Sequence, residues 1–489
     1  MSESLKSKAI SGAKWNWLYN IGSYFISFFL SIILARLLEP CEFGILGMLN
    51  IFTAVAMVFI NSGFTSALIR ENKSSDADFS TIFYYNIVVS HIFYLVLFFT
   101  APLIADFYNE PKLIILTRLV SLVFLINSFG IVQNAILVRE LNFKKQTVFS
   151  LIGLFVSVII SIIMAFNGYG VFSIVAQVLS QAIVTNLLLW FYADWKPKGG
   201  FNKVSFKRLW KFASQILATN IIIRVIDNID SILIGKIFSA TNLGYYVRAK
   251  STKQIPEQIL VGTLNTTAFA ILSKINQDEE KFRTMHLKLF NLCVYGFFPV
   301  AFGLIGISKS FTILIYSAKW IPAVPILQTI ALTSIPLFLE ALFMQTIMAK
   351  GEGKVYFKLN AFKKLIGLLT IPFGLFWGLY PFLFAYLFIS FVGLLLNIYF
   401  TSKLIQISKK KYIITMLLPL LMSLIMLTLV LFTSKLNIQS HLILLIIQLI
   451  IGFLTYTILS ILFKVKEFWT FKLLLFEQMK NLRTRFTKK

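Results

Sequence analysis

Three ionisable residues follow one another at a spacing of three in an otherwise apolar stretch of the chain. Arg224, Asp227 and Asp230 would share one face of a helix, because residues three apart are neighbours on a helix surface. An ionisable side chain inside a membrane span costs about 2.5–3.5 kcal/mol on insertion scales, so such groups usually face one another or a water-filled cavity. Two interpretations stay open: a self-neutralising cluster that steers helix packing, and a contact for a substrate or a coupling ion.

The next helical segment, 243–270, carries a surplus of positive charge. Lys253 and Glu257 are four residues apart and can form an ion pair, which leaves Arg248 and Lys250 unmatched. Lipid cannot surround so polar a helix, so the segment either lines a cavity or lies at the outer membrane surface. A cavity with surplus cations attracts an anion, and the planar fork of arginine suits phosphate oxygens. The candidate substrate-binding residues are Arg224, Arg248, Lys250 and Lys253.

The acidic residues inside apolar segments are candidates for binding a coupling ion. Glu340 is alone in its segment, so it either binds a coupling cation or proton or is a protonated structural carboxyl. Lys363 and Lys364 lie near the end of another segment, and we expect their long side chains to reach the membrane surface. The candidate coupling-ion residues are Asp227, Asp230, Glu257 and Glu340.

Motifs for catalysis and for cofactor binding are absent from the sequence. Cys41 and Cys293 are the only cysteines, which excludes a disulfide framework and a cysteine metal cluster. The 3 histidines are far apart and form no ligand spacing, and no Walker loop is present. We therefore expect a protein that is not an enzyme and that has no cofactor and no metal centre.

The segments that position these residues are apolar stretches of membrane-spanning length. Of 489 residues, 58% are hydrophobic and 13% are charged, whereas a soluble domain carries about a quarter charged residues. A helix of about 20 apolar residues crosses about 30 Å of hydrocarbon. The pattern predicts an all-α integral membrane protein of about fourteen transmembrane helices, at 15–36, 43–63, 82–105, 113–135, 147–167, 170–192, 212–237, 243–270, 286–308, 323–349, 356–378, 381–402, 412–433 and 441–463.

Basic residues alternate from one side of the predicted spans to the other. On one set of connections lie 33 of the 46 lysines and arginines, and six lie on the opposite set. The positive-inside rule then places both termini in the cytoplasm. The net charge of +26 thus faces anionic membrane lipids, and no nucleic-acid partner is required to explain it. The aromatic and basic tail after residue 463 is expected to lie along the interface as an amphipathic helix.

Two parts of the chain repeat a short pattern. A basic residue followed by a glycine occurs as Arg36 and Gly44 and again, 200 residues later, as Lys236 and Gly244. We interpret this as a parallel duplication, related by an axis along the membrane normal. The predicted domains are an N-terminal six-helix bundle (1–192), a basic linker (193–211), a C-terminal six-helix bundle (212–403), two additional helices (404–463) and a basic tail (464–489).

Short motifs in the first 350 residues resemble those of the polysaccharide flippases of the Wzx type, the polysaccharide-transport branch of the multidrug, oligosaccharidyl-lipid and polysaccharide exporter superfamily. The similar stretches are 11–15, 34–38 through 43–44, 61–64 with 67–69, 135–144, 168–171, 195–197, 230 through 234–236, 243–246 and 319–320. The last spans add only length and topology to the resemblance. Glu39-Pro40 departs from the small or polar pair that is usual there.

The resemblance implies a fold, an activity and partners. The fold would be two six-helix bundles in a V, as in the multidrug exporters of the MATE type, followed by two helices. The activity would be transfer of undecaprenyl-diphosphate-linked oligosaccharide across the bacterial inner membrane for a surface polysaccharide such as O-antigen or lipopolysaccharide. Membrane lipids, a polysaccharide polymerase and glycosyltransferases would be its partners. The resemblance also implies a cationic cavity, which would suit Arg224, Arg248 and Lys250.

Two other functions stay open at the level of the sequence. A cation-coupled antiporter of drugs or small solutes would share the fold and would use Asp227, Asp230 or Glu340 for its ion. A membrane-embedded glycan polymerase or acyltransferase belongs to a different class and would show catalytic turnover without a two-sided membrane. Neither the driving ion nor the sugars of a cargo follow from the residues.

Overall fold

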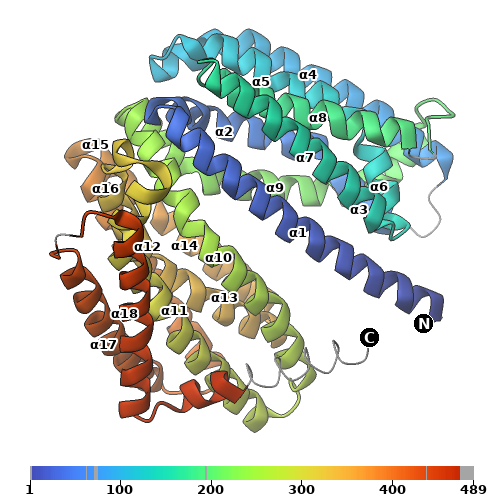
Figure 1. Cartoon of the computed structure of the whole chain (residues 1–489). Helices are drawn as coiled ribbons and strands as arrows, with labels where there is room; N and C mark the ends of the chain where they lie inside the picture. The colour runs from blue at the N-terminus through green and yellow to red at the C-terminus, as the bar shows by residue number, and fades with distance from the viewer. Residues whose placement is uncertain (1–2, 62, 71–74, 193–194, 437, 474–489) are drawn as a thin grey trace, which may run out of the picture. The chain divides into compact units, whose positions relative to one another are not determined.

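The computed structural model describes residues 3–61, 63–70, 75–192, 195–436 and 438–473. Within these residues all regular secondary structure is helical (Figure 1). The helices of the first part of the chain are α1 Glu3–Leu37, α2 Pro40–Asn61, α3 Gly63–Arg70, α4 Asp76–Tyr108, α5 Lys112–Ser128, α6 Ile131–Arg139, α7 Phe143–Phe166, α8 Phe172–Tyr192, α9 Lys203–Ile237 and α10 Ala240–Lys274.

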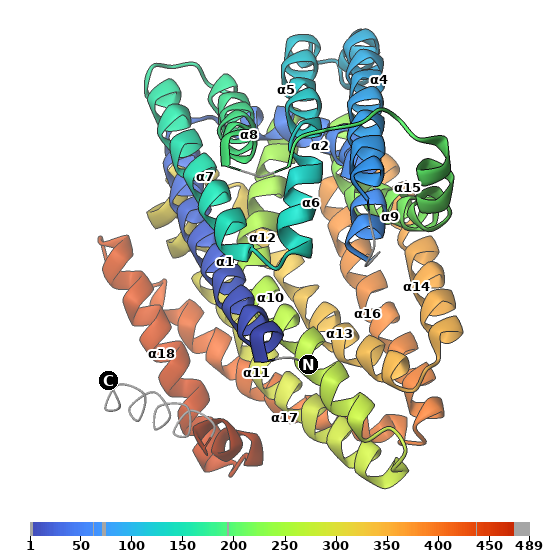
Figure 2. The same cartoon turned by 90° about the vertical axis from the view of Figure 1, so that its right-hand side faces the viewer.

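The second part of the chain continues the helical pattern. Its helices are α11 Glu279–Tyr316, the short 3-10 helix η1 Ala318–Trp320, α12 Ala323–Leu332, α13 Ser334–Ala349, α14 Gly353–Gly367, α15 Thr370–Trp377, α16 Leu379–Leu404, α17 Lys409–Thr433 and α18 His441–Leu462 (Figure 2). Lys466–Leu473 is also helical, as expected for the first part of the tail, and 474–489 lies outside the described residues.

Eleven helical segments among the described residues are long and apolar enough to cross a membrane, or 12 if α5 and α6, which meet at 47°, form one span. The chain is therefore a multi-pass, all-helical membrane protein. The remaining two of the fourteen predicted spans are α9 and α10, which have 35 residues each. Each is about 50 Å long, which exceeds the hydrocarbon thickness. Both contain several charged residues, and neither is among the eleven apolar segments.

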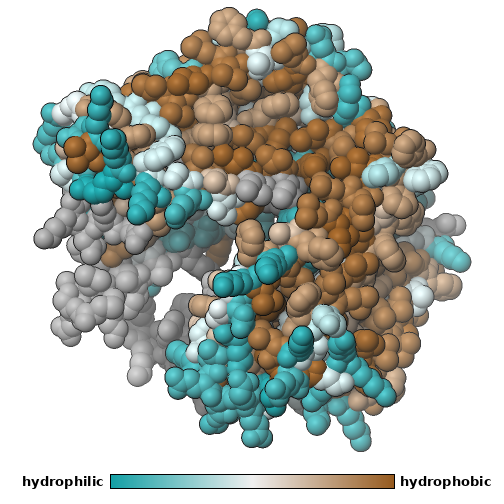
Figure 3. Space-filling view, turned by 180° about the vertical axis from the view of Figure 1, so that it is seen from behind, coloured by the Kyte–Doolittle hydropathy of each residue, from teal (hydrophilic) through white to brown (hydrophobic). Residues whose placement is uncertain are grey.

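Apolar side chains that would be costly in water are exposed along these helices. Phe99 is 71% exposed, Phe191 78%, Phe376 76% and Phe453 72%. On the face shown in Figure 3, apolar side chains cover most of the visible surface and hydrophilic groups gather in separate patches. Contact with lipid tails explains exposed apolar residues on this scale.

Capping residues and turn glycines set the ends of the helices. Ser75 and Asp78 form a reciprocal capping box at the start of α4, and Asn202 caps α9 by accepting from two backbone N–H groups. The connections at 167–170 and 378–381, which lie between predicted spans, have positive φ at Gly168, Gly170 and Gly378. Glycine adopts these angles without steric cost.

The chain divides into two compact units, residues Met1–Val247 and Arg248–Lys489. In the first unit α7 packs on α8 and α1, α4 packs on α5, and α9 packs against α2, α3 and α4. The division falls within α10, whereas the predicted bundles divide at 193–211. The two six-helix bundles therefore remain a prediction.

The described part of the basic segment, 195–211, is anchored within the first unit. The Trp195 indole N–H donates to Asp76, and the Asn202 backbone N–H donates to the Thr81 hydroxyl. Arg208, in the second turn of α9, forms an ion pair with the buried carboxylate of Asp78 at 2.6 Å. The start of α9 is thus joined to the start of α4 by side-chain contacts.

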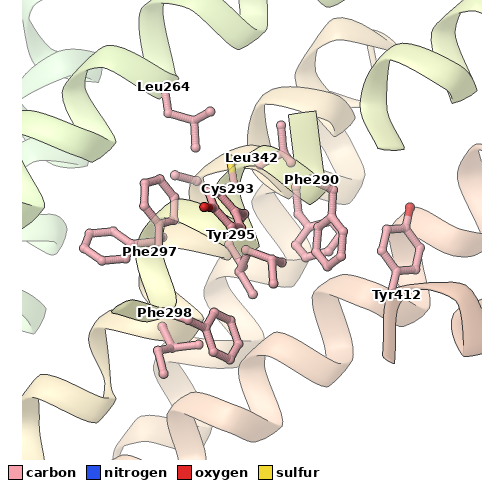
Figure 4. Packing of buried hydrophobic residues seen from close by; sticks show 14 of the residues in the cluster. Leu264, Phe290, Cys293, Tyr295, Phe297, Phe298, Leu342 and Tyr412 are labelled. Carbon is pink, nitrogen blue, oxygen red and sulfur yellow. The ribbon is translucent and has the colours of Figure 1, made fainter. Parts of the chain in front are cut away.

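The core of the second unit is built from aromatic and aliphatic side chains of α10, α11, α13, α16, α17 and α18. Figure 4 shows part of this cluster, with Phe290, Phe297, Phe298 and Tyr412. Cys293 lies within it and is 5% exposed. Burial of this kind is what holds α17 and α18 against α11.

Glycines of the two repeats contact each other's helices. A Cβ on Gly44 of α2 would lie 1.7 Å from the Ala240 carbonyl oxygen, and a Cβ on Gly244 of α10 would lie 1.8 Å from the Pro40 carbonyl oxygen. Pro40 and Ala240 are themselves 200 residues apart. Such reciprocal contacts are what a two-fold relation between two segments produces. The crossing of α2 and α10 therefore supports the duplication inferred from the sequence.

Candidate functional site

A cavity of about 670 Å³, lined by both apolar and polar side chains, lies within the first unit. Residues of α1, α2, α5, α7, α8 and α9 line it. Arg224 contributes the one formal charge among the described lining residues. The structure thus places this predicted substrate-binding residue at a cavity.

Carboxamides and hydroxyls supply most of the remaining polar surface of the Arg224 cavity. Asn50, Asn127, Gln181, Thr185 and Asn228 line it. Asn127 Oδ1 accepts a hydrogen bond of 3.1 Å from Asn186 Nδ2, which fixes the orientation of the amide and leaves its own N–H groups as donors. Donors of this type and one guanidinium can bind an anion that carries hydroxyl groups.

Sequence reasoning did not find these amides. A single Asn or Gln inside an apolar helix is far less conspicuous than a charge, and Asn50, Asn127 and Gln181 come from three different helices. The sequence feature that could have identified them is a neutral polar residue within a segment of membrane-spanning length, since such a residue often faces another helix or a cavity.

Asp230 of the α9 cluster contacts the following helix, α10. Asp230 accepts a hydrogen bond from the Tyr246 hydroxyl of α10 and one of 2.8 Å from the Ser231 backbone N–H. It therefore joins α9 to the first turns of α10. The side chain of Asp227 lies outside the described residues, so its role as a coupling-ion residue remains a prediction.

Arg248 is buried in the second unit. Its side chain is 5% exposed, and its guanidinium carbon lies 4.8 Å from the ring centre of Tyr316 and 5.1 Å from that of Trp320. Cation–π contact of this kind stabilises a desolvated arginine. We expected this residue at a water-filled cavity. The structure instead packs it against the rings of Tyr316 and Trp320, which are distant from Arg248 in the sequence.

Lys253 and Glu257 form the ion pair that their spacing predicted. Lys253 Nζ lies 3.0 Å from Glu257 Oε1 and donates to Thr333 Oγ1 at 2.8 Å. The Ser334 hydroxyl donates to the same Glu257 oxygen. Both side chains are buried, so each charge is compensated by its partner. Lys250, one turn earlier, is half-buried.

Removing one partner of this pair is expected to destabilise the second unit. Replacing Lys253 by methionine leaves the Glu257 carboxylate buried without its ammonium partner, at a cost of about 3–5 kcal/mol. The change should lower the midpoint of thermal unfolding of the purified protein. The double variant Lys253→Met with Glu257→Leu should lose less than the two single variants combined. Additive losses would contradict a coupled pair.

Glu340, which is the one ionisable residue of its predicted span, forms an ion pair with Lys363 of another helix. Glu340 Oε1 lies 2.5 Å from Lys363 Nζ, and the same ammonium donates to Asn397 Oδ1 at 3.2 Å. Lys363 therefore points to α13 and α16 and not to the membrane surface. The attraction between a carboxylate and an ammonium is stronger inside the protein than in water, because the dielectric constant is lower there.

His286 belongs to a buried network that sequence reasoning missed. Its Nδ1 lies 2.9 Å from Thr346 Oγ1 and its Nε2 lies 2.8 Å from the Tyr412 hydroxyl. Because the Thr346 hydroxyl donates to the Leu342 carbonyl, Nδ1 donates and Nε2 accepts. The network links α11, α13 and α17, and all of its polar groups are satisfied within the protein.

The sequence matches a known family over more than half of its length. Residues 33–325 match the family model described as polysaccharide biosynthesis protein. The chain is 26% identical over 359 residues to the teichuronic acid biosynthesis protein TuaB of Bacillus subtilis, which covers 72% of this chain and 74% of TuaB. It is 24% identical over 425 residues to the lipopolysaccharide biosynthesis protein WzxC of Escherichia coli, covering 86% of each chain.

Solved structures share the fold. The lipid II flippase MurJ in an inward closed conformation superposes with a TM-score of 0.72 at 19% identity, over 91% of this chain and 98% of MurJ. An inward-facing multidrug transporter of the MATE family superposes with a TM-score of 0.61 at 14% identity, over 78% of this chain and 94% of the transporter. The arrangement of helices is therefore like that of these transporters.

Proposed function

Because the chain belongs to the polysaccharide biosynthesis protein family, we propose that it is a flippase that moves undecaprenyl-diphosphate-linked oligosaccharide from the cytoplasmic to the outer leaflet. It is a multi-pass membrane protein with a fold like that of MurJ and the MATE transporters. The observation that carries the proposal is the cavity of the first unit, with Arg224 as its described charge.

The chemistry of this cargo fits the Arg224 cavity. A diphosphate cannot cross hydrocarbon unaided, because its charges would be desolvated. A guanidinium offers it paired hydrogen-bond donors, and the surrounding amides and hydroxyls can bind sugar hydroxyls. The cavity volume of about 670 Å³ lies in the usual range for a ligand pocket of about 300–1,000 Å³. The prenyl chain would remain in lipid.

Translocation on this proposal requires the finer architecture predicted from the sequence. The polar helices α9 and α10 are the two further spans that bring the total to fourteen, with both termini in the cytoplasm. The chain would then form two six-helix bundles and two additional helices, and the bundles would alternate access around the cargo. Arg248 and Lys253, which are buried, would support helix packing, and Lys250, which is half-buried, stays a predicted substrate-binding residue.

The proposal also assigns a cellular place. The protein would lie in the bacterial inner membrane and receive its cargo from glycosyltransferases on the cytoplasmic side. A polysaccharide polymerase would consume the cargo on the other side. Of the relatives, WzxC is named for lipopolysaccharide biosynthesis and TuaB for teichuronic acid biosynthesis.

Deletion of the gene in its own host tests the function. We expect surface polysaccharide to be lost and the lipid-linked oligosaccharide to remain in the inner leaflet, where periplasmic glycosidase cannot reach it. Expression of the wild-type chain should restore both. Unchanged polysaccharide together with altered drug resistance would favour the antiporter, and polymerisation or acylation by detergent-purified protein would favour the enzyme.

A further inference from the structure

Three helices of the second unit meet at one buried ammonium. The Lys363 side chain of α14 is 10% exposed, and its ammonium lies 2.5 Å from Glu340 Oε1 of α13 and 3.2 Å from the side-chain amide oxygen Oδ1 of Asn397 of α16. Neither contact was visible in the sequence, because Lys363 and Glu340 are 23 residues apart on different helices.

The surface that receives this ammonium is a stripe along α16. Gly393, Asn397 and Thr401 are spaced by four residues and therefore lie on one face of the helix. The Lys363 chain passes over Gly393, where an added Cβ would lie 3.5 Å from its Cδ. Asn397 and Thr401 are fully buried, and the Thr401 hydroxyl has no hydrogen-bond partner among the described residues.

The groups on this stripe are oxygen ligands. A carboxylate, an amide carbonyl and a hydroxyl are the donors that hard cations select. The Glu340 side chain is 32% exposed, so a small ion could reach the carboxylate if the ammonium were absent. The ammonium and a monovalent metal ion carry the same charge and would satisfy the same oxygens.

We propose that Lys363 is a built-in cation that fills a latent sodium site formed by Glu340, Asn397 and Thr401. The wild-type protein then requires no sodium ion at this place, and removal of the lysine ammonium creates the site. This inference concerns the ion requirement of the second unit and holds whatever the cargo of the protein is. It revises the role of Glu340, which holds a tethered charge and not a diffusible coupling ion.

Thermal unfolding of the purified full-length protein tests the proposal. Wild-type protein should unfold at the same temperature in sodium chloride and in choline chloride of equal ionic strength. The Lys363→Met variant should unfold at a lower temperature in choline and be stabilised by sodium in a saturable manner, by about 2 °C or more. A structural ion pair alone would give the same loss in both salts.

Two further variants make the result specific. Lys364→Met removes the neighbouring charge, which lies on an exposed side chain, and should acquire no sodium response. Lys363→Met combined with Glu340→Gln should lose the response, because the carboxylate is gone. If Lys363→Met does not fold, Lys363→Gln serves in its place. Equal stability of the lysine variant in sodium and choline would overturn the proposal, as would sodium stabilisation of the wild type that Glu340→Gln removes.

Discussion

Replacing Arg224 by glutamate is expected to abolish export of surface polysaccharide while the amount of protein in the membrane stays unchanged. Arg224 is exposed on α9 and supplies the described positive charge of its cavity. One charge-assisted hydrogen bond contributes about 1.5–3 kcal/mol, which corresponds to roughly 10- to 150-fold in affinity. A glutamate would add repulsion to that loss.

Matched variants separate the charge of Arg224 from its packing. Arg224→Lys keeps the charge without the planar fork and should retain part of the export. Lys211→Glu reverses an exposed charge on the same helix and should leave export near the wild-type level. Quantification of surface polysaccharide and of membrane-inserted protein measures both effects. Normal export by Arg224→Glu would remove the physical basis of the proposed anionic cargo.

An alanine at either Gly44 or Gly244 is expected to separate α2 from α10. Each added Cβ would lie under 2 Å from a backbone carbonyl oxygen of the other helix, and a backbone atom cannot turn aside as a flexible side chain can. Overpacking of this kind costs about 1–3 kcal/mol. We expect a lower midpoint of thermal unfolding and reduced export for both variants.

Gly262→Ala is the control for the glycine variants. It makes the same change on α10 at a position where an added Cβ meets nothing within 4 Å. Alanine there should be neutral or stabilising by about 0.5–1 kcal/mol, because glycine is unfavourable within a helix. The double variant Gly44→Ala with Gly244→Ala should lose less than the sum of the single changes, since either one already opens the same crossing. Wild-type stability of both Gly44→Ala and Gly244→Ala would refute the close packing.

Local patterns of the sequence predicted the elements of this protein well. Spans and turns follow from hydropathy and glycine, and the pair of Lys253 with Glu257 follows from a spacing of one helical turn. Long-range contacts could not be predicted in this way. The rings around Arg248, the carboxylate at Lys363 and the amides around Arg224 come together only when distant helices pack.

The contacts at the start of α9 have a mechanical consequence. Asp78 binds Arg208, and Arg224 lies on the same helix, about 24 Å further along at 1.5 Å per residue. A tilt of α9 by about 10° around Arg208 would displace Arg224 by roughly 4 Å. A substitution that breaks the Asp78–Arg208 pair is therefore expected to shift Arg224 relative to the other residues that line its cavity, although neither Asp78 nor Arg208 lines that cavity.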